Sequence, residues 1–221
     1  MNRHKDIGLI WAAVCTGSIN HITQFMIIAS KKIKLRPART SDRKKIFLWL
    51  TQSDVTPFMM GLPLYPDLPM PTWKEFCDDY KPHFFNSSGE GKGRDYIIIA
   101  NGNEEVGTIR YNALDKKKCS VALDIWMRAI KYCGFGSGGD ALNALCDYLH
   151  ERYGVTNFVI SPSRRNKQAI ASYQKCGFKC VSIPSKKIQK KDFGISACTD
   201  NIIMIKKVSR RLTIGKTPCN H

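Results

Sequence analysis

Alternating apolar and polar residues predict several β-strands along the chain. The pattern covers Ile33 to Arg36, a hairpin with the sequence DYIIIANGNEEVGTIRYNAL, and the run CSVALDIWM. Because strand residues alternate between two faces, the apolar side chains of this last run share one face, and Asp124 and Trp126 lie on the other. Apolar runs at VTNFVI, Phe178 to Ile183 and Asn201 to Lys207 complete the predicted sheet.

Apolar residues at helical spacing predict helices between these strands. We expect them over residues 40–50, 73–85, 138–151 and 167–176. Some of them start at a residue whose side-chain oxygen can satisfy a free amide group: Thr40 or Ser41, Thr72, and Asn166. Gly177 ends the last helix, because glycine readily adopts the left-handed conformation found there. The segment 57–71, which contains five prolines, is expected to be an irregular loop.

Length and composition limit the number of folded units. The chain has 221 residues, 43% of them hydrophobic, which suffices for one domain with a buried core. We assign residues 31–208 to this domain, residues 1–30 to an N-terminal extension and residues 209–221 to a basic tail. The segment IGLIWAAVC resembles the apolar part of a signal peptide, but Asp6 borders it, and Asn20 and His21 interrupt any membrane span. Residues 1–25 are either an extra or frayed helix, or a translated upstream extension with folding beginning near Met26.

The chain is strongly basic and contains many cysteines. Its 35 Lys and Arg against 18 Asp and Glu give a net charge of +17, so its surface attracts polyanions such as nucleic acid, anionic lipid or a phosphorylated cofactor. Nucleic acid would bind through nonspecific charge, because no recognised stacking or recognition motif is present. The nine cysteines lack the CxxC spacing of zinc or redox sites. We therefore expect free thiols in a reducing cytoplasm, and no metal.

The glycine-rich stretch KYCGFGSGGDALNAL precedes a predicted helix and admits two interpretations. Gly134, Gly136 and Gly139 satisfy G-x-G-x-x-G, the pattern of a dinucleotide-binding turn in which the backbone approaches a pyrophosphate. That fold requires a strand directly before the loop and an acidic residue about 20 positions later. Here RAIKYC intervenes, and no Asp or Glu occurs from Gly154 through Gln174. An NADP-binding oxidoreductase is therefore a weaker alternative.

The second interpretation rests on two motifs in order. Lys131, Gly134 and Gly136 match basic or Gln-x-x-G-x-G/A, and the segment ISPSRRNKQAIASYQKCGFKCV matches N-x-x-A-I-x-x-Y-x-K-x-G-F. Together they resemble the cofactor site of the GNAT superfamily of acetyl-coenzyme A (acetyl-CoA) dependent acetyltransferases, and the likeness runs from about Ile33 to Lys207. It implies an α/β (α+β) fold of the GNAT type, a central mixed, mostly antiparallel sheet of about six to seven strands flanked by about four helices.

Within this superfamily the chain is most similar to the aminoglycoside 6'-N-acetyltransferase group. LWLTQSDVTPFMMG resembles that group's early helix and substrate loop, PTWKEFCDDYKPHFF its second helix, and LDIWM the strand with its acidic residue. The sequence departs at Met59 and Met60, where that group often has tryptophan, and at Ser161, where it often has Asp. A polycationic drug needs a cluster of carboxylates, so these departures and the positive net charge leave the acceptor amine open.

The resemblance implies catalytic roles for Asp124 and Tyr173. A protonated amine must lose a proton before it attacks a thioester, and Asp124 is the candidate base; it could instead anchor a cationic substrate or be a surface residue of an amphipathic strand. Tyr173 would stabilise the departing thiolate, with a plain core residue as the alternative. Direct transfer in a ternary complex is favoured, because a covalent route through Cys133 needs a basic partner. Glu104 and Glu105, in or beside the hairpin turn, are expected to be solvated.

The resemblance also implies the binding residues. Amides of the glycine loop would cradle the CoA pyrophosphate at the helix N-terminus, and Asn166 would bind the pantetheine arm or act only as a helix cap. The predicted cofactor set is Trp126, Met127, Lys131, Gly134, Phe135, Gly136, Ser137, Gly138, Gly139, Asn166, Ala169 and Tyr173. The predicted acceptor set is Met59, Met60, Tyr65, Asp124 and Trp126. We expect an amine-bearing acceptor, no membrane span, and a monomer or homodimer. A basic nucleic-acid-binding module stays open as another function class.

Overall fold

The computed structural model describes residues 27–60, 70–86, 88, 91–100, 102–117, 119–181 and 201–209. They form a sheet with the order β1-β2-β3-β4-β5-β6-β8-β7, in which only β5 and β6 pair in parallel. The strands are β1 (Ile28–Ala29), β2 (Ile33–Pro37), β3 (Gly93–Ala100), β4 (Glu104–Asn112), β5 (Ser120–Met127), β6 (Asn157–Ile160), β7 (Lys179–Val181) and β8 (Ile203–Lys207). The mixed, mostly antiparallel sheet is confirmed. The prediction missed β1, because a two-residue edge strand is too short to give a pattern.

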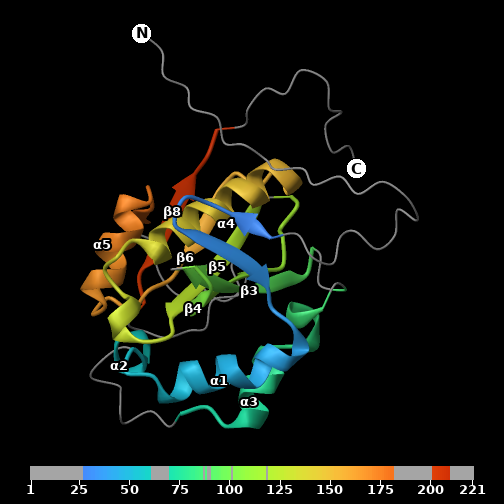
Figure 1. The fold of residues 1–221 in the computed structure, drawn as a ribbon. Helices are drawn as coiled ribbons and strands as arrows, with labels where there is room; N and C mark the ends of the chain where they lie inside the picture. The colour runs from blue at the N-terminus through green and yellow to red at the C-terminus, as the bar shows by residue number, and fades with distance from the viewer. Residues whose placement is uncertain are drawn as a thin grey trace.

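Helices cover both faces of this sheet (Figure 1). They are α1 (Arg43–Gln52), α2 (Thr56–Met60), α3 (Trp73–Asp79), α4 (Ser137–Tyr153) and α5 (Lys167–Lys175). On one face, α4 buries Leu142, Leu145 and Leu149 against strand residues. On the other face, Ile46 of α1 and Phe76 of α3 pack in a second apolar cluster. The sheet is therefore the middle layer of three.

Strand β5 contributes to both apolar clusters, as its alternation predicts. Val121, Leu123 and Met127 belong to the cluster under α4. Trp126 belongs to the cluster on the opposite face, together with Phe76. Asp124 has the same strand parity as Trp126, and therefore lies on the face that α3 covers.

The starts of two helices show where cap prediction succeeds and fails. Thr72 caps α3 as predicted, and its hydroxyl accepts the amide of Glu75 at 3.2 Å. Thr40 and Ser41, which were expected to cap the first helix, instead lie in a 3-10 turn, and α1 begins after it. The carboxylate of Asp42 accepts a backbone amide of this turn at 2.8 Å. A charged acceptor therefore organises the turn in place of a hydroxyl cap.

Prolines set the helix boundaries between α1 and β3. Pro57 lies in the first turn of α2, where its missing amide is not needed. The predicted irregular loop 57–71 therefore begins with a short helix, and its residues 61–69 lie outside the described residues. The predicted helix to Phe85 ends early at Asp79, because Pro82 favours an extended conformation at Lys81.

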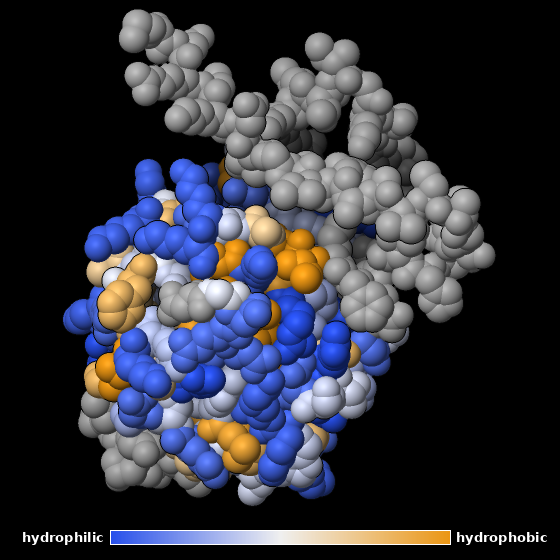
Figure 2. Space-filling model, viewed as in Figure 1, coloured by the Kyte–Doolittle hydropathy of each residue, from blue (hydrophilic) through white to orange (hydrophobic). Residues whose placement is uncertain are grey.

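Some predictions concern parts of the chain outside the described residues. These are the extension over residues 1–25, the end of the strand predicted at 178–183, and the tail beyond residue 209. Hydrophilic side chains cover most of the molecular face drawn in Figure 2, with apolar groups scattered among them, as is usual for a protein surface. Within the described residues, no helix has the length and apolar character needed to cross a membrane.

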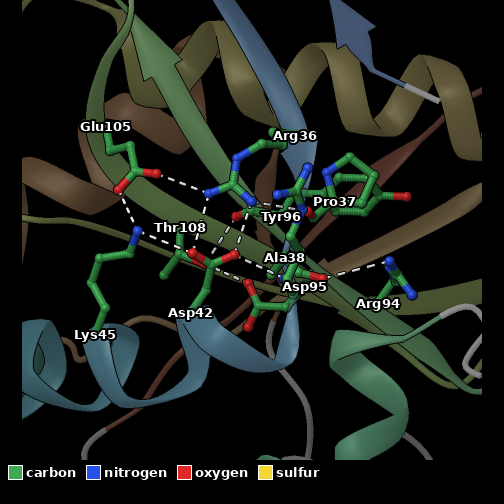
Figure 3. Close-up of polar contacts among 11 residues, drawn as sticks. Arg36, Pro37, Ala38, Asp42, Lys45, Arg94, Asp95, Tyr96, Glu105 and Thr108 are labelled. Atoms are coloured by element: carbon green, nitrogen blue, oxygen red, sulfur yellow. Dashed lines mark hydrogen bonds and ion pairs between the residues drawn. The ribbon is translucent and has the colours of Figure 1, made fainter. Parts of the chain in front are cut away.

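A largely buried ion-pair network joins β2, α1 and β4 (Figure 3). Arg36 contacts Asp42 and Glu105 at 2.8 Å each, and Lys45 of α1 contacts the same two carboxylates. The expectation that Glu105 is solvated is therefore wrong. Glu104, whose side chain is 40% exposed, remains in contact with solvent, and its carboxylate also accepts hydrogen bonds from Arg128 and Tyr132. Both glutamates meet cations from distant parts of the chain, which a local pattern does not reveal.

Asp42 links this network to the pH dependence of stability. Burial raises the pKa of its carboxyl, but hydrogen bonds from Arg36, the Arg39 amide and Lys45 outweigh burial and lower the pKa from 3.8 to about 2. A carboxyl whose pKa falls on folding stabilises the folded state above its unfolded pKa, and this contribution is lost as the pH falls toward the folded pKa. We expect Asp42→Asn to lower the free energy of unfolding by about 2 kcal/mol at pH 7 and by about half as much at pH 3. Urea denaturation measures this, and equal losses at both pH values would contradict the ion-pair origin.

Candidate active site

Strands β5 and β6 separate part of the way along, and this opening is the centre of the site. They pair only over Ser120–Ala122 of β5, although β5 continues to Met127. The amide of Arg128, the residue after β5, donates to the carbonyl of Val106 in β4. Alternate strand residues direct their backbone groups to the same side, so those of Leu123, Ile125 and Met127 face away from β4 and toward the opening. These amides can donate to a ligand carbonyl held between the strands.

A cleft of about 400 Å³ lies at this opening. It is lined by β5, the β5–α4 connection, the start of α4, and α5. Most of the predicted cofactor residues line it, and the exceptions are Lys131, Phe135 and Ser137. Val55 and Phe58, which sequence analysis did not single out, line it as well. The signal for them was their position beside the methionines of the segment that resembles a substrate loop.

The glycine loop before α4 has the conformation that its sequence requires. Gly134 and Gly136 have φ values of +87° and +86°, which residues with a side chain rarely adopt. A Cβ on Gly139 would lie 3.1 Å from the sulfur of Cys176, so a larger residue would crowd the start of the helix. The first amides of α4 and the positive end of its dipole lie at this loop. The loop therefore fits an anionic group such as the CoA pyrophosphate.

The turn between β1 and β2 packs against this loop and brings a cation to it. Asp140 of α4 accepts the amide of Lys32 at 3.0 Å and a hydrogen bond from the Ser30 hydroxyl. The ammonium of Lys32 donates to the carbonyl of Phe135 at 3.4 Å and would lie 3.2 Å from a Cβ on Gly136. Sequence analysis missed Lys32, because it precedes the loop by 103 residues.

Asn166 caps α5 and also ties it to α2. Its Oδ1 accepts the amide of Ala169 at 3.0 Å, and its Nδ2 donates to the carbonyl of Phe58 at 3.2 Å. The predicted helix cap is therefore present, and Asn166 and Ala169 both line the cleft. Contact of Asn166 with a pantetheine arm stays a prediction.

Tyr173 of α5 lines the cleft from the side of the sheet that carries α4. Its ring centre lies 6.3 Å from that of Phe178. Burial, together with the charges of Asp124 and Cys176, raises the pKa of its phenol. The hydroxyl is therefore protonated at neutral pH and is available as a hydrogen-bond donor, the state that the predicted acid role requires.

Asp124 is a residue of β5, and its side chain lies on the face of the sheet opposite to Tyr173. Its side chain is 44% exposed, and its Oδ2 lies 3.4 Å from a guanidinium nitrogen of Arg110. Asp124 is not among the residues that line the cleft; the lining begins with the next residue of β5, Ile125. The two predicted catalytic side chains, Asp124 and Tyr173, thus flank the open segment of β5 on its two faces.

The remaining predicted residues occupy different environments. Trp126 is buried at 3% exposure, and its ring packs edge-on against Tyr80 with centres 5.9 Å apart. It therefore borders the cleft as part of the apolar wall. Lys131 is exposed, with its ammonium 5.0 Å from the ring centre of a neighbouring tyrosine, and Phe135 is 72% exposed. The whole acceptor set, Asp124 and Trp126 included, stays a prediction; Met59 and Met60 lie at the end of α2, and Tyr65 lies outside the described residues.

Comparison with protein families identifies the class to which this fold and cleft belong. Residues 32–179 match the family described as an acetyltransferase (GNAT) domain. The match spans more than half of the chain. The protein is therefore an acetyl-CoA-dependent N-acetyltransferase. The chain belongs to the GNAT acetyltransferase family, as its two motifs predicted. No curated protein matches the chain.

Solved structures share the fold at low sequence identity. Spermidine N-acetyltransferase from Vibrio cholerae, in complex with CoA and spermine, superposes with a TM-score of 0.61 at 16% identity, covering 82% of this chain and 98% of that one. RimL, a ribosomal L7/L12 alpha-N-protein acetyltransferase in complex with CoA, gives 0.63 at 17% identity, covering 84% and 100%. AAC(6')-Ib, in complex with ribostamycin and CoA, gives 0.59 at 19% identity, covering 80% and 94%. These similarities support the fold, and the three proteins bind very different acceptors.

Proposed function

We propose that the protein transfers the acetyl group of acetyl-CoA to a primary amine by direct attack within a ternary complex. The observation that carries this proposal is the opening between β5 and β6, where strand amides, the glycine loop and Tyr173 border one cleft. Acetyl-CoA supplies the activated acetyl group. The residues of the chain bind and orient it and move the protons.

The binding roles follow from the fixed dipoles around the cleft. Amides of the glycine loop and of the first turn of α4 would hold the pyrophosphate, with Lys32 as a nearby cation. The open amides of Ile125 and Met127 would donate to the thioester carbonyl and to the negative charge that develops on its oxygen. Such preorganised donors are among the largest contributors to catalysis of acyl transfer.

Two side chains would move the protons. Asp124 accepts a proton from the acceptor ammonium, directly or through a water molecule, and so frees the nitrogen lone pair. The protonated phenol of Tyr173 donates to the departing sulfur. Burial and the charge of Asp54 raise the pKa of Cys133, which also lines the cleft. A neutral thiol is a weak nucleophile, and this supports direct transfer over a covalent route through Cys133.

The proposed acceptor is a primary amine, and three classes of amine fit the site. These are an aminoglycoside-like amine, a small metabolic amine, and a protein N-terminus or lysine. The side chain of Asp124 is 44% exposed and contacts the guanidinium of Arg110. Its carboxylate gives this side of the site a negative charge that suits any of these cationic groups.

Titration calorimetry with acetyl-CoA, followed by thiol release across an amine panel, tests the proposal. We expect acetyl-CoA to bind and one amine class to release CoA thiol, with mass spectrometry showing an acetylated amine. The panel contains spermine, ribostamycin and peptides with free N-termini. A folded protein that does not bind acetyl-CoA would refute the proposal, and the basic surface would then be tested with nucleic acid.

Tyr173→Phe tests the acid role. We expect kcat to fall about 10- to 100-fold with little change in KM for acetyl-CoA, because the hydroxyl acts on the leaving sulfur and the ring keeps its packing. The control is Tyr148→Phe, which removes a hydroxyl from α4, outside the cleft lining. Equal effects of the two substitutions on kcat would argue against an acid role for Tyr173.

The proposal extends to the organisation of the chain. We assign residues 31–208 to the acetyltransferase domain, and we place the protein in the cytoplasm. The cysteines that the structure describes are all free, which supports a reducing compartment.

A further inference from the structure

A buried arginine stands beside Asp124 in the sheet. In the strand register, Arg110 of β4 lies directly opposite Asp95 of β3 on one side and Asp124 of β5 on the other. Directly opposite residues share a face, so the three side chains form a row under α3. The Arg110 side chain is 10% exposed, and its guanidinium carbon lies 3.9 Å from the ring centre of Tyr80. Packing therefore fixes the position of this cation.

Arg110 has two kinds of acidic neighbour. Its terminal nitrogen lies 3.3 Å from Asp79 and 3.4 Å from Asp124, whose side chains are 68% and 44% exposed. Asp95 is fully buried and accepts the hydroxyl of Thr108, and burial raises the pKa of Asp95 to about 7. Asp95 is therefore only partly ionised near neutral pH. The charge of the guanidinium remains directed to the two exposed carboxylates.

This arrangement is costly as a purely structural device. The Nε and Nη1 groups of Arg110 and the Oδ2 of Asp95 are buried, and they have no hydrogen-bond partner among the described residues. Buried polar groups without partners destabilise a fold, and apolar side chains often replace buried ion pairs without loss of stability. A site that breaks such local rules is expected to have a functional reason. Of the two exposed carboxylates beside Arg110, Asp124 is the one with a proposed role in the reaction.

We propose that Arg110 is a positioning residue that holds the Asp124 carboxylate in place for the acceptor amine at the open segment of β5. The guanidinium contacts Oδ2 and leaves Oδ1 to accept a hydrogen bond from the ammonium or from an intervening water. A carboxylate that is already oriented loses less conformational freedom when the amine binds. This inference rests on the proposed role of Asp124.

A double-mutant cycle on the full chain tests it, using the panel amine that gives thiol release. Arg110→Met removes the charge and retains an apolar side chain against Tyr80. We expect it to lower kcat/KM for the amine about 10- to 100-fold, while Kd for acetyl-CoA stays within about twofold. In the Asp124→Asn background the same substitution is expected to cost less than about threefold, because no carboxylate remains to be positioned. Arg110→Lys should recover part of the activity, since it restores the charge without the planar fork.

Asp79→Asn is the matched control. It removes the other exposed carboxylate from the same guanidinium nitrogen and leaves Asp124 unchanged. We expect kcat/KM to stay within about twofold of wild type. Equal losses from Arg110→Met in the presence and absence of Asp124, or full activity of Arg110→Met, would overturn the positioning role. An inactive Asp124→Asn beside a fully active Arg110→Met refutes only this inference, whereas a fully active Asp124→Asn refutes the catalytic role of Asp124 itself.

A second readout does not depend on turnover. Urea unfolding of the wild type, the two single variants and the double variant measures the coupling between Arg110 and Asp124 in the protein without ligands. A nonzero coupling is expected from their contact, and additive effects on unfolding would overturn the inference. Where circular dichroism shows Arg110→Met to be unfolded, Arg110→Lys and Arg110→Gln take its place in both cycles.

Discussion

Asp124→Asn is expected to lower kcat/KM for the acceptor amine by about 10²- to 10⁴-fold, the range for loss of a positioned general base. Asparagine keeps the size of the side chain and an oxygen that can accept from Arg110, so the sheet should be preserved. Asp124 does not line the cleft in which acetyl-CoA is proposed to bind. We therefore expect Kd for acetyl-CoA to change by less than about twofold. Steady-state thiol release and calorimetry measure the two quantities.

The same variant separates the two roles that the sequence left open for Asp124. A base contributes to the chemical step, so its loss lowers kcat, whereas an anchor binds the ammonium before the reaction, so its loss raises KM for the amine. A base is also less necessary for an acceptor that is already unprotonated. Acceptors with a lower amine pKa should therefore suffer less from Asp124→Asn if Asp124 is a base, and equally if it is an anchor.

Asp78→Asn supplies the control for this experiment. Asp78 is a carboxylate on α3 that pairs with Lys74 and has a side chain 68% exposed. Its neutralisation changes the net charge by the same amount, and we expect kcat/KM to stay within about twofold. A comparable loss from both substitutions would point to a general effect of surface charge, and not to a role of Asp124 in the reaction.

The sequence predicted those parts of the site whose geometry is local. The cap at Asn166, the glycine end of α5 at Gly177, and the glycine-rich turn before α4 each depend on a few neighbouring residues. Short-range rules therefore located them. The two faces of β5 followed from alternation alone, because both faces of that strand pack against helices.

The partners of the charged residues could not be predicted in the same way. Arg36 and Glu105 are 69 residues apart, and Lys32 and Phe135 are 103 apart. Arg110 receives neighbours from β3, β5 and α3. Which charges meet depends on strand order and register, and neither is written in a local pattern. This is why Glu105 was expected to be solvated although it belongs to a partly buried network.

Gly136→Asp is expected to weaken acetyl-CoA binding at least about 100-fold, because it places a carboxylate where the pyrophosphate is proposed to lie. Gly136 is the residue directly before α4, with a φ of +86°. Unit charges about 4 Å apart near a protein surface repel by about 4 kcal/mol, and about 1.4 kcal/mol corresponds to a tenfold change in affinity. The new carboxylate would also lie near the Lys32 ammonium and compete with the phosphates for it.

Gly136→Asn separates this charge effect from backbone strain, since Asn and Asp have the same shape and both tolerate the left-handed conformation better than other side chains. We expect Gly136→Asn to weaken binding far less than Gly136→Asp. The difference should disappear when acetyl-pantetheine, which has no phosphates, replaces acetyl-CoA in an activity assay. Calorimetry that gives the two variants the same Kd for acetyl-CoA would show that no phosphate lies at this turn. The cleft would then bind its ligand in a different orientation from the one that the dipole of α4 favours.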